Sequence, residues 1–209
     1  MTKIKICGLQ SLLDISYVNL YQPDYVGFVF AKSKRQIDDT LARQLKNELA
    51  DNIQAVGVFV NDKVQHIVDL CKENIIDIVQ LHGDEDEVYI RELRRFITNP
   101  IIKAVRVQSM EQILKMQKFP CNHLLLDTYS KENYGGSGRS FDRTLIPKDC
   151  KPFFLAGGLN TTNIKEAIHQ CHPYCIDLSS GVETDHKKDK KKIKEVIKMV
   201  HIMNNSNLC

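Results

Sequence analysis

Two side chains that can transfer protons each end an apolar segment of the sequence. Cys7 closes KIKIC and is followed at once by Gly8, and Asp127 closes HLLLD. A thiol beside cationic groups can ionise and act as a base, whereas a carboxyl group in a partly desolvated pocket can keep its proton and donate it. The simpler interpretations are packing of a buried thiol and capping of a turn by the aspartate. If the fold brings both residues to one site, they predict acid–base chemistry.

Three glycine-rich segments occur later in the chain. LAGGLN contains Gly157 and Gly158, and LSSGVET contains Ser180 and Gly181. Backbone N–H groups at such turns bind phosphate because they point outward with partial positive charge, so these two segments predict a phosphate-bearing ligand. The alternative is that they are only helix caps or turns. The third segment, GGSGRS at 135–140, lacks the GK[ST] of a nucleotide-binding loop and is expected to be either a flexible turn or a mobile lid near Asp127.

The elements that would position these residues are indicated by eight short apolar runs. Nearly continuous apolar character, rather than strict alternation, is typical of parallel strands that are covered on both faces. The eight runs are KIKIC, YVGFVF, QAVGVFV, IIDIVQL, IIKAVRV, HLLLD, FFLAG and YCIDLS. Helical patterns separate most of them, for example a leucine stripe in residues 38–50 and a capping box of Ser109 and Gln112.

This alternation predicts an α/β protein, namely a single TIM (βα)8 barrel with eight parallel strands. A doubly wound open sheet is the structural rival, but it usually has fewer strands. No linker rich in Pro, Gly or Ser divides the chain, so residues 1–209 are expected to form one phosphate-binding domain.

Composition excludes several classes of protein. The sequence is 43% hydrophobic and has no apolar run near the length that spans a bilayer, so we expect neither membrane insertion nor, without a signal segment, export from the cytoplasm. The net charge of +3 comes largely from HKKDKKKIK, where apolar residues keep helical spacing, which favours a solvated helix face over nucleic-acid binding. The seven cysteines form no CxxC pair, so reduced thiols and no metal site are expected.

The active residues of a TIM barrel lie where each strand ends and its loop begins. That rule selects Cys7, the SKR segment with Arg35, His82, Arg106, Asp127, Gly157, Gly158 and Ser179 to Gly181.

Taken in order along nearly the whole chain, these motifs resemble the phosphoribosylanthranilate isomerase family. The motifs are KICGL, GFVF with SKR, VGVFVN, VQLHGDE, KAVRV, LLLDT, GGSGRSFD, LAGGLN with TTNI, and DLSSGVET with KKDKKKI. The resemblance implies a cofactor-free Amadori rearrangement of a small phosphosugar substrate in tryptophan biosynthesis, carried out by a monomer or homodimer.

The resemblance also implies roles for single residues. Asp127 matches the general acid and Cys7 the general base, and Gly8 lets the backbone beside the base approach the ligand. Arg35 is expected to bind the anthranilate carboxylate, with a surface ion pair as the alternative, while His82 and Asp177 line the substrate pocket. Backbone at Gly157, Gly158, Ser180 and Gly181 would hold the phosphate.

Three residues depart from the usual family pattern. Lys34 stands where proline is common, which predicts a less rigid Arg35. Arg143 follows FD where tryptophan is frequent, which suggests altered packing beneath the strand-six loop, and His186 replaces a frequent glycine in the loop after the last strand.

Other functions remain open from the sequence. A sugar-phosphate epimerase would need a metal cluster of His and Asp that cannot be assembled here, and indole-glycerol-phosphate synthase usually has a longer chain with a catalytic lysine. A silent phosphosugar-binding module would be expected to lack Cys7 or Asp127. Relaxed specificity toward a related aminoaldose of histidine biosynthesis is a minor alternative.

Overall fold

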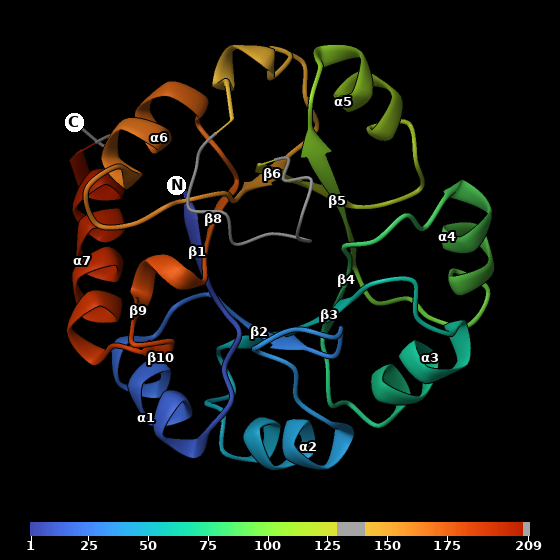
Figure 1. The fold of residues 1–209 in the computed structure, drawn as a ribbon, viewed down its shortest axis with the longest axis horizontal. Helices are drawn as coiled ribbons and strands as arrows, with labels where there is room; N and C mark the ends of the chain where they lie inside the picture. The colour runs from blue at the N-terminus through green and yellow to red at the C-terminus, as the bar shows by residue number, and fades with distance from the viewer. Residues whose placement is uncertain (129–140, 207–209) are drawn as a thin grey trace.

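A closed barrel of parallel strands forms the centre of the computed structural model, which describes residues 1–128 and 141–206 (Figure 1). Each strand pairs in parallel with its sequence neighbours, and β8 pairs with β1 to close the barrel. The strands are β1 (Lys3–Cys7), β2 (Tyr25–Val29), β3 (Gln54–Phe59), β4 (Ile78–Leu81), β5 (Ile101–Val107), β6 (His123–Thr128), β7 (Phe153–Leu155) and β8 (Cys175–Leu178). The predicted TIM barrel with eight parallel strands is confirmed.

Helices form a ring outside the barrel (Figure 1). They are α1 (Leu12–Tyr21), α2 (Asp39–Asn47), α3 (Val64–Lys72), α4 (Glu87–Leu93), α5 (Met110–Met116), α6 (Ile164–Cys171) and α7 (Lys190–Ser206). Across the described ranges, no helix is both long enough and apolar enough to cross a bilayer.

The connection from β6 to β7 differs from the regular βα pattern. In its described part, residues 141–152, the only helical element is the short 3-10 helix η1 (Arg143–Leu145). The GGSGRS segment, for which a lid or a flexible turn was expected, lies outside the described residues. After β8 the chain adds η2 (Ser180–Val182) and a hairpin of β9 (Glu183–Thr184) and β10 (Lys187–Lys188).

Capping side chains fix the starts of several helices. Asp38 caps α2 by accepting from the backbone N–H of Leu41, and Ser109 caps α5 by accepting from that of Gln112. The predicted capping box is present in a shifted form, because the side chain of Gln112 accepts from the backbone N–H of Gln108 rather than from that of Ser109. These bonds satisfy backbone donors that would otherwise lack partners at a helix start.

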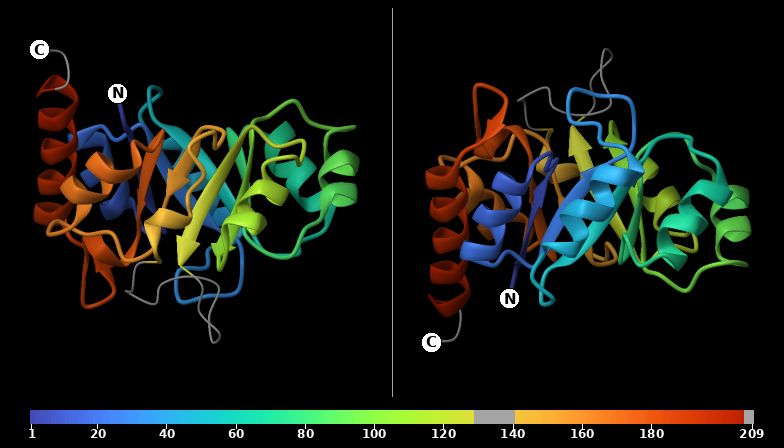
Figure 2. Two further views of the ribbon diagram at one scale, coloured as in Figure 1. Left: turned by 90° about the horizontal axis from the view of Figure 1, so that it is seen from above. Right: turned by 90° about the horizontal axis from the view of Figure 1, so that it is seen from below.

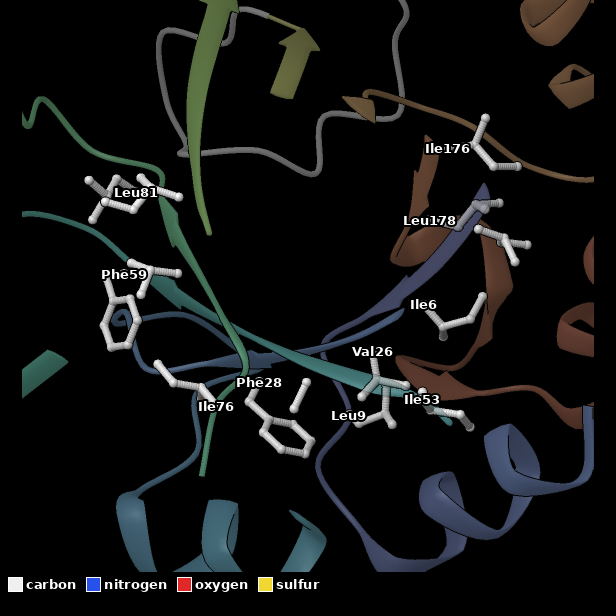
Figure 3. Packing of buried hydrophobic residues seen from close by; sticks show 14 of the residues in the cluster. Ile6, Leu9, Val26, Phe28, Ile53, Phe59, Ile76, Leu81, Ile176 and Leu178 are labelled. Atoms are coloured by element: carbon white, nitrogen blue, oxygen red, sulfur yellow. The ribbon is translucent and has the colours of Figure 1, made fainter. Parts of the chain in front are cut away.

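Side chains alternate between the inside and the outside of the barrel. Outward-facing residues such as Ile6, Val26 and Phe28 pack in the large core between the strands and the helices (Figure 3). Residues of the opposite parity, such as Val56 and Leu125, form a smaller core inside the barrel. The polar residues of the site share this inward parity, so the strand pleat decides which side chains reach the barrel interior.

The amino-terminal end of the barrel holds a cluster of aromatic rings around Lys3. Its ammonium group donates to the Tyr25 hydroxyl at 3.1 Å and lies over the rings of Tyr25 and Tyr174. The hydroxyls of the two tyrosines are 3.0 Å apart, and His123 stacks on Tyr174. We call these four residues the Lys3 cluster.

Two segments project together from the opposite, carboxyl-terminal end. The loop of residues 30–37 after β2 and the β9–β10 hairpin lie on this face (Figure 2). A bidentate ion pair between Arg35 and Glu183 joins them, with both oxygens at 2.7 Å. Two segments that are distant in sequence are therefore held together at the mouth of the barrel.

Candidate active site

Cys7 lies at the carboxyl-terminal end of β1, with the ammonium group of Lys5 beneath it. Both side chains point inward, and Lys5 is completely buried. The Lys5 ammonium lies 3.6 Å from Cys7 Sγ, 2.5 Å from Gln80 Oε1 and 3.0 Å from Asp177 Oδ2. All three of its N–H donors thus have acceptors, one of which is the Cys7 thiol.

Opposing effects act on the pKa of Cys7. Burial disfavours the charged thiolate and raises the pKa of the thiol, whereas the nearby cations Lys5 and Lys188 favour the thiolate and lower it. The balance keeps the pKa of the Cys7 thiol above its ordinary value. Burial therefore favours the protonated thiol of Cys7 over the thiolate that the neighbouring cations alone would favour.

Asp127 is the penultimate residue of β6 and is 5% exposed. Its Oδ1 accepts from the backbone N–H of Thr128 at 2.7 Å, and its Oδ2 lies 3.4 Å from His82 Nε2. A Cβ at position 157 would lie 3.1 Å from Asp127 Oδ1 and 2.3 Å from the Thr128 hydroxyl, and Gly157 has a φ of +87°. Glycine is thus required at position 157 both by its backbone conformation and by the space beside the acid.

His82 follows β4 and faces the same interior. Its Nδ1 lies 2.9 Å from Gln80 Nε2. Two buried side-chain atoms of the described residues, His82 Nε2 and Asp177 Oδ1, have no hydrogen-bond partner. Because an unsatisfied buried polar atom is costly, such atoms mark a place where a ligand can complete the bonding.

Arg35 is held at the mouth by Glu183. Burial raises the pKa of the Glu183 carboxyl, but hydrogen bonds and charges from Arg35 and Lys188 outweigh burial and lower it to about 2. Lys188 is itself buried and contacts Glu183 at 2.6 Å and the carbonyl oxygen of Ser179 at 3.2 Å. The loss of proline at Lys34 therefore does not leave Arg35 unrestrained, because the bidentate pair with Glu183 fixes its guanidinium.

Gly8 lies directly against Arg35. A Cβ on Gly8 would meet Arg35 Cδ at 2.5 Å, and the φ of Gly8 is +82°. The glycine after Cys7 therefore makes room for the stem of Arg35 as well as for a positive φ.

The two glycine loops predicted to hold phosphate are in contact. A Cβ on Gly181 would meet the carbonyl oxygen of Leu159 at 1.9 Å, so the loop after β8 packs closely against the loop after β7. Within residues 1–128 and 141–206, no acceptor is paired with the backbone N–H groups of Gly157, Gly158 or Ser180. Such donors can bind an anion.

Four residues of the site were not singled out from the sequence: Lys5, Gln80, Glu183 and Lys188. Lys5 and Gln80 carried a signal, because each stands two residues before a predicted site residue in an otherwise apolar strand and so shares its inward face. Glu183 and Lys188 carried none, because their roles depend on the hairpin. Arg106 is near the mouth but donates to Asp84 at 2.7 Å.

The departures at positions 143 and 186 lie on η1 and in the β9–β10 turn, not on the strands that carry Cys7 and Asp127. Arg143 begins η1 and donates to Gln170 of α6 at 3.1 Å. Asp185 and His186 form the turn of the β9–β10 hairpin, with φ values of 52° and 61°. Both values are in the left-handed region, as in a type I′ turn, for which glycine suits the second position.

A closed parallel barrel with a buried thiol and a buried carboxyl group at its carboxyl-terminal mouth defines an acid–base enzyme of the TIM-barrel class. A model of the family described as N-(5′-phosphoribosyl)anthranilate (PRA) isomerase matches residues 4–199. The chain belongs to this family.

Individual relatives agree. N-(5′-phosphoribosyl)anthranilate isomerase of Endomicrobium trichonymphae is 52% identical over 200 residues, covering 96% of this chain and 98% of that protein. The crystal structure of phosphoribosyl anthranilate isomerase from Thermotoga maritima has a TM-score of 0.84 at 39% identity, covering 95% of this chain and 98% of the other. Another isomerase structure, 36% identical with a TM-score of 0.77 and coverage of 95% and 97%, is a complex with reduced 1-(O-carboxyphenylamino)-1-deoxyribulose 5-phosphate.

Proposed function

We propose that Asp127 and Cys7 are the acid and base of the reaction for which the family is named. That reaction is the Amadori rearrangement of N-(5′-phosphoribosyl)anthranilate to 1-(2-carboxyphenylamino)-1-deoxyribulose 5-phosphate in tryptophan biosynthesis. The observation that carries the assignment is the placement of both groups, buried, at the carboxyl ends of β1 and β6.

The first step uses Asp127. Its carboxyl proton passes to the ring oxygen of the sugar as the bond from that oxygen to C1 breaks, and the lone pair of the anthranilate nitrogen forms the C1–nitrogen double bond. The product is an open-chain Schiff base with a new hydroxyl, and Asp127 is left as a carboxylate. Proton transfer by such a positioned group accelerates a reaction by about 10²- to 10⁴-fold.

The second step uses Cys7. As a thiolate it removes the proton from C2, and the electrons of that bond form the enolamine while the nitrogen recovers its lone pair. Tautomerisation then gives the ketone. Lys5 and Lys188 supply positive charge beside the sulfur and so favour the thiolate that this step requires.

The remaining predicted roles concern binding. The guanidinium of Arg35, fixed by Glu183, supports a role in binding the anthranilate carboxylate. Asp177 Oδ1, which lacks a partner in the described part of the chain, supports a contact with a sugar hydroxyl, and His82, beside Asp127, supports a place in the lining of the same pocket. The open backbone donors at Gly157, Gly158 and Ser180, with Gly181 packed beside them, support phosphate binding. A single domain over residues 1–209 in the cytoplasm remains our expectation.

The test is the loss of anthranilate fluorescence when purified protein meets freshly generated substrate without added metal. We expect rapid loss with the wild type and a loss of turnover of about 10²- to 10⁴-fold for Cys7→Ser, because a hydroxyl is a much weaker base. Cys171→Ser, at a half-buried thiol of α6, is the matched control and should keep full activity. An active Cys7→Ser enzyme would remove Cys7 from the mechanism.

Titration of the thiol gives a second test of the base. Because burial raises the pKa of Cys7, the thiolate absorbance of the wild type minus that of Cys7→Ser should develop only above the ordinary thiol pKa of 9.0. Thiolate absorbance that is already complete at neutral pH would contradict the thiol as the resting form.

A further inference from the structure

A chain of buried polar side chains runs beneath the mouth from Cys7 to Asp127. Lys5 lies 3.6 Å from Cys7 Sγ and 2.5 Å from Gln80 Oε1. Gln80 Nε2 lies 2.9 Å from His82 Nδ1, and His82 Nε2 lies 3.4 Å from Asp127 Oδ2. Every neighbouring pair is thus within contact distance, and the chain joins the proposed base to the proposed acid.

Hydrogen-bond chemistry fixes the direction of this chain. An ammonium group only donates, so the carbonyl oxygen of the Gln80 amide must face Lys5 and its NH2 group must face His82. Nδ1 of His82 is therefore an acceptor. A neutral imidazole that accepts at Nδ1 carries its proton on Nε2, which lies 3.4 Å from Asp127 Oδ2 without forming a hydrogen bond to it in this structure.

Burial makes the arrangement rigid. Lys5 is fully buried and Gln80 is 1% exposed, so water cannot readily replace either partner. An amide in such a place is costly unless both of its ends are bonded, and only the orientation just described bonds both ends. A leucine would fill the same space without this cost, so the glutamine is best explained by what its two ends do.

We propose that Gln80 is a positioning residue that sets the tautomer of His82, so that the His82 N–H stabilises the Asp127 carboxylate as it forms. The proposal rests on the proposed function, in which Asp127 gives its proton to the ring oxygen. A neutral carboxyl group gains little from the N–H at 3.4 Å, whereas the carboxylate left after proton transfer accepts a charge-assisted hydrogen bond. An interaction that strengthens in the transition state raises kcat more than it lowers KM.

Gln80→Glu is the decisive variant because it keeps the shape of the side chain and replaces the NH2 donor by an oxygen that accepts. The new carboxylate still accepts from Lys5, but it cannot donate to His82 Nδ1, so Nδ1 must carry a proton, and the neutral imidazole then has no proton on Nε2. We expect kcat to fall about 10- to 100-fold with KM changed less than about threefold, as for loss of a partner that orients a catalytic group. Gln54→Glu, at an exposed position of β3, adds the same charge as a control and should leave kcat unchanged.

The protonation of His82 can be observed directly by nitrogen NMR of protein labelled at its seven histidines. The His82 signals are assigned by their loss in His82→Gln. The wild type should show His82 protonated on Nε2 alone, and Gln80→Glu should show protonation at Nδ1. Unfolding in urea shows whether each variant is folded. If Gln80→Glu does not fold, Gln80→Met replaces it. The methionine cannot donate to His82 Nδ1, so the same fall in kcat is expected.

A rescue variant separates tautomer control from packing. The amide of His82→Gln can present an N–H to Asp127 without help from Gln80, so this variant should keep more activity than His82→Leu. Adding Gln80→Glu to His82→Gln should then cost less than about threefold, because the two positions act through one bond.

Three outcomes would overturn the proposal: an unchanged tautomer in the glutamate variant, a changed tautomer with unchanged kcat, or full additivity of the two substitutions. The spectra do not depend on turnover. An inactive wild type with the expected tautomer would therefore reject the proposed function separately.

Discussion

Lys3 and Lys5 are two residues apart on β1 and both point into the barrel, yet they lie in opposite surroundings. Lys3 is enclosed by aromatic rings and donates to the Tyr25 hydroxyl. Lys5 is bonded to an amide, a carboxylate and the Cys7 thiol. The first cluster closes the amino-terminal end of the barrel, and the second lies beneath its mouth.

The difference lies in how completely the buried polar groups are satisfied. In the Lys3 cluster the hydroxyls of Tyr25 and Tyr174 bond each other, and His123 Nδ1 pairs with the carbonyl oxygen of Pro152. At the mouth, His82 Nε2 and Asp177 Oδ1 lack partners among the described residues. A satisfied cluster stabilises the fold, whereas unsatisfied buried atoms are held ready for a ligand. Substitutions at the two ends should therefore affect different quantities.

The largest expected effect is at the mouth. Asp127→Asn should reduce kcat about 10²- to 10⁴-fold, because the amide has no proton of suitable acidity to give to the ring oxygen. The free energy of unfolding in urea should change by less than about 1 kcal/mol, because Asn keeps an oxygen for the Thr128 N–H.

The exposed Asp51→Asn is the matched control and should behave as the wild type. If Asp127→Asn unfolded at a much lower urea concentration while its folded fraction kept normal turnover, Asp127 would stabilise the fold rather than take part in the reaction.

Low pH should lower the free energy of unfolding through Glu183, which lies at the mouth of the barrel. Its pKa is about 2 in the folded protein, below the ordinary value of 4.5, so it contributes stability above pH 4.5 that is lost as the pH falls toward 2. Solvent screens part of this interaction. We therefore expect the free energy of unfolding of the wild type to exceed that of Glu183→Gln by about 2 kcal/mol at pH 6.

Urea unfolding of both proteins between pH 6 and pH 2 measures this difference, which should shrink as Glu183 is protonated. Glu195→Gln, on the exposed face of α7, should show no such trend. A constant difference across the range would mean that the ion pairs of Glu183 do not stabilise the fold.

Tyr174→Phe should affect stability and spare catalysis. It removes the hydrogen bond between the two tyrosine hydroxyls at the amino-terminal end, which should lower the free energy of unfolding by about 1 kcal/mol. Turnover should remain within about twofold of wild type. Tyr21→Phe is the control, because the hydroxyl of Tyr21 has no hydrogen bond among the described residues. A larger effect of Tyr174→Phe on kcat than on stability would contradict the contrast between the two ends of the barrel.

The smallest effect is expected in the hairpin turn near the mouth. A non-glycine residue in the left-handed region is strained by about 1 kcal/mol or more, and His186→Gly removes this strain. The glycine also makes the unfolded chain more flexible, which offsets part of the gain. The net gain in unfolding free energy should be about 0.5 kcal/mol, measured in urea with Asp51→Gly at an exposed turn as a control. A loss of stability would show that the His186 side chain contributes more than its backbone strain costs.

Much of the fold was predictable because the signals are local. The runs KIKIC and IIKAVRV predict β1 and β5 with their observed bounds, since a strand covered on both faces is an uninterrupted apolar segment. Helix α1 was harder to recognise, because Leu12, Leu13 and Leu20 are exposed and weaken its amphipathic pattern. The described part of the β6–β7 connection has only η1 where a regular pattern would have a helix, and no local signal marked that difference.

The sequence by itself determined the barrel, the strand-end positions of Cys7 and Asp127, and the family, because apolar periodicity and motif order are properties of neighbouring residues. Only the tertiary structure decided which groups surround them. The bonds from Lys5 to Gln80 and Asp177 join residues 75 and 172 positions apart, and the pair of Arg35 and Glu183 joins residues 148 apart. The burial that raises the Cys7 pKa depends on barrel closure. Electrostatics and hydrogen bonding depend on distance in space, and closing the barrel is what makes those distances short.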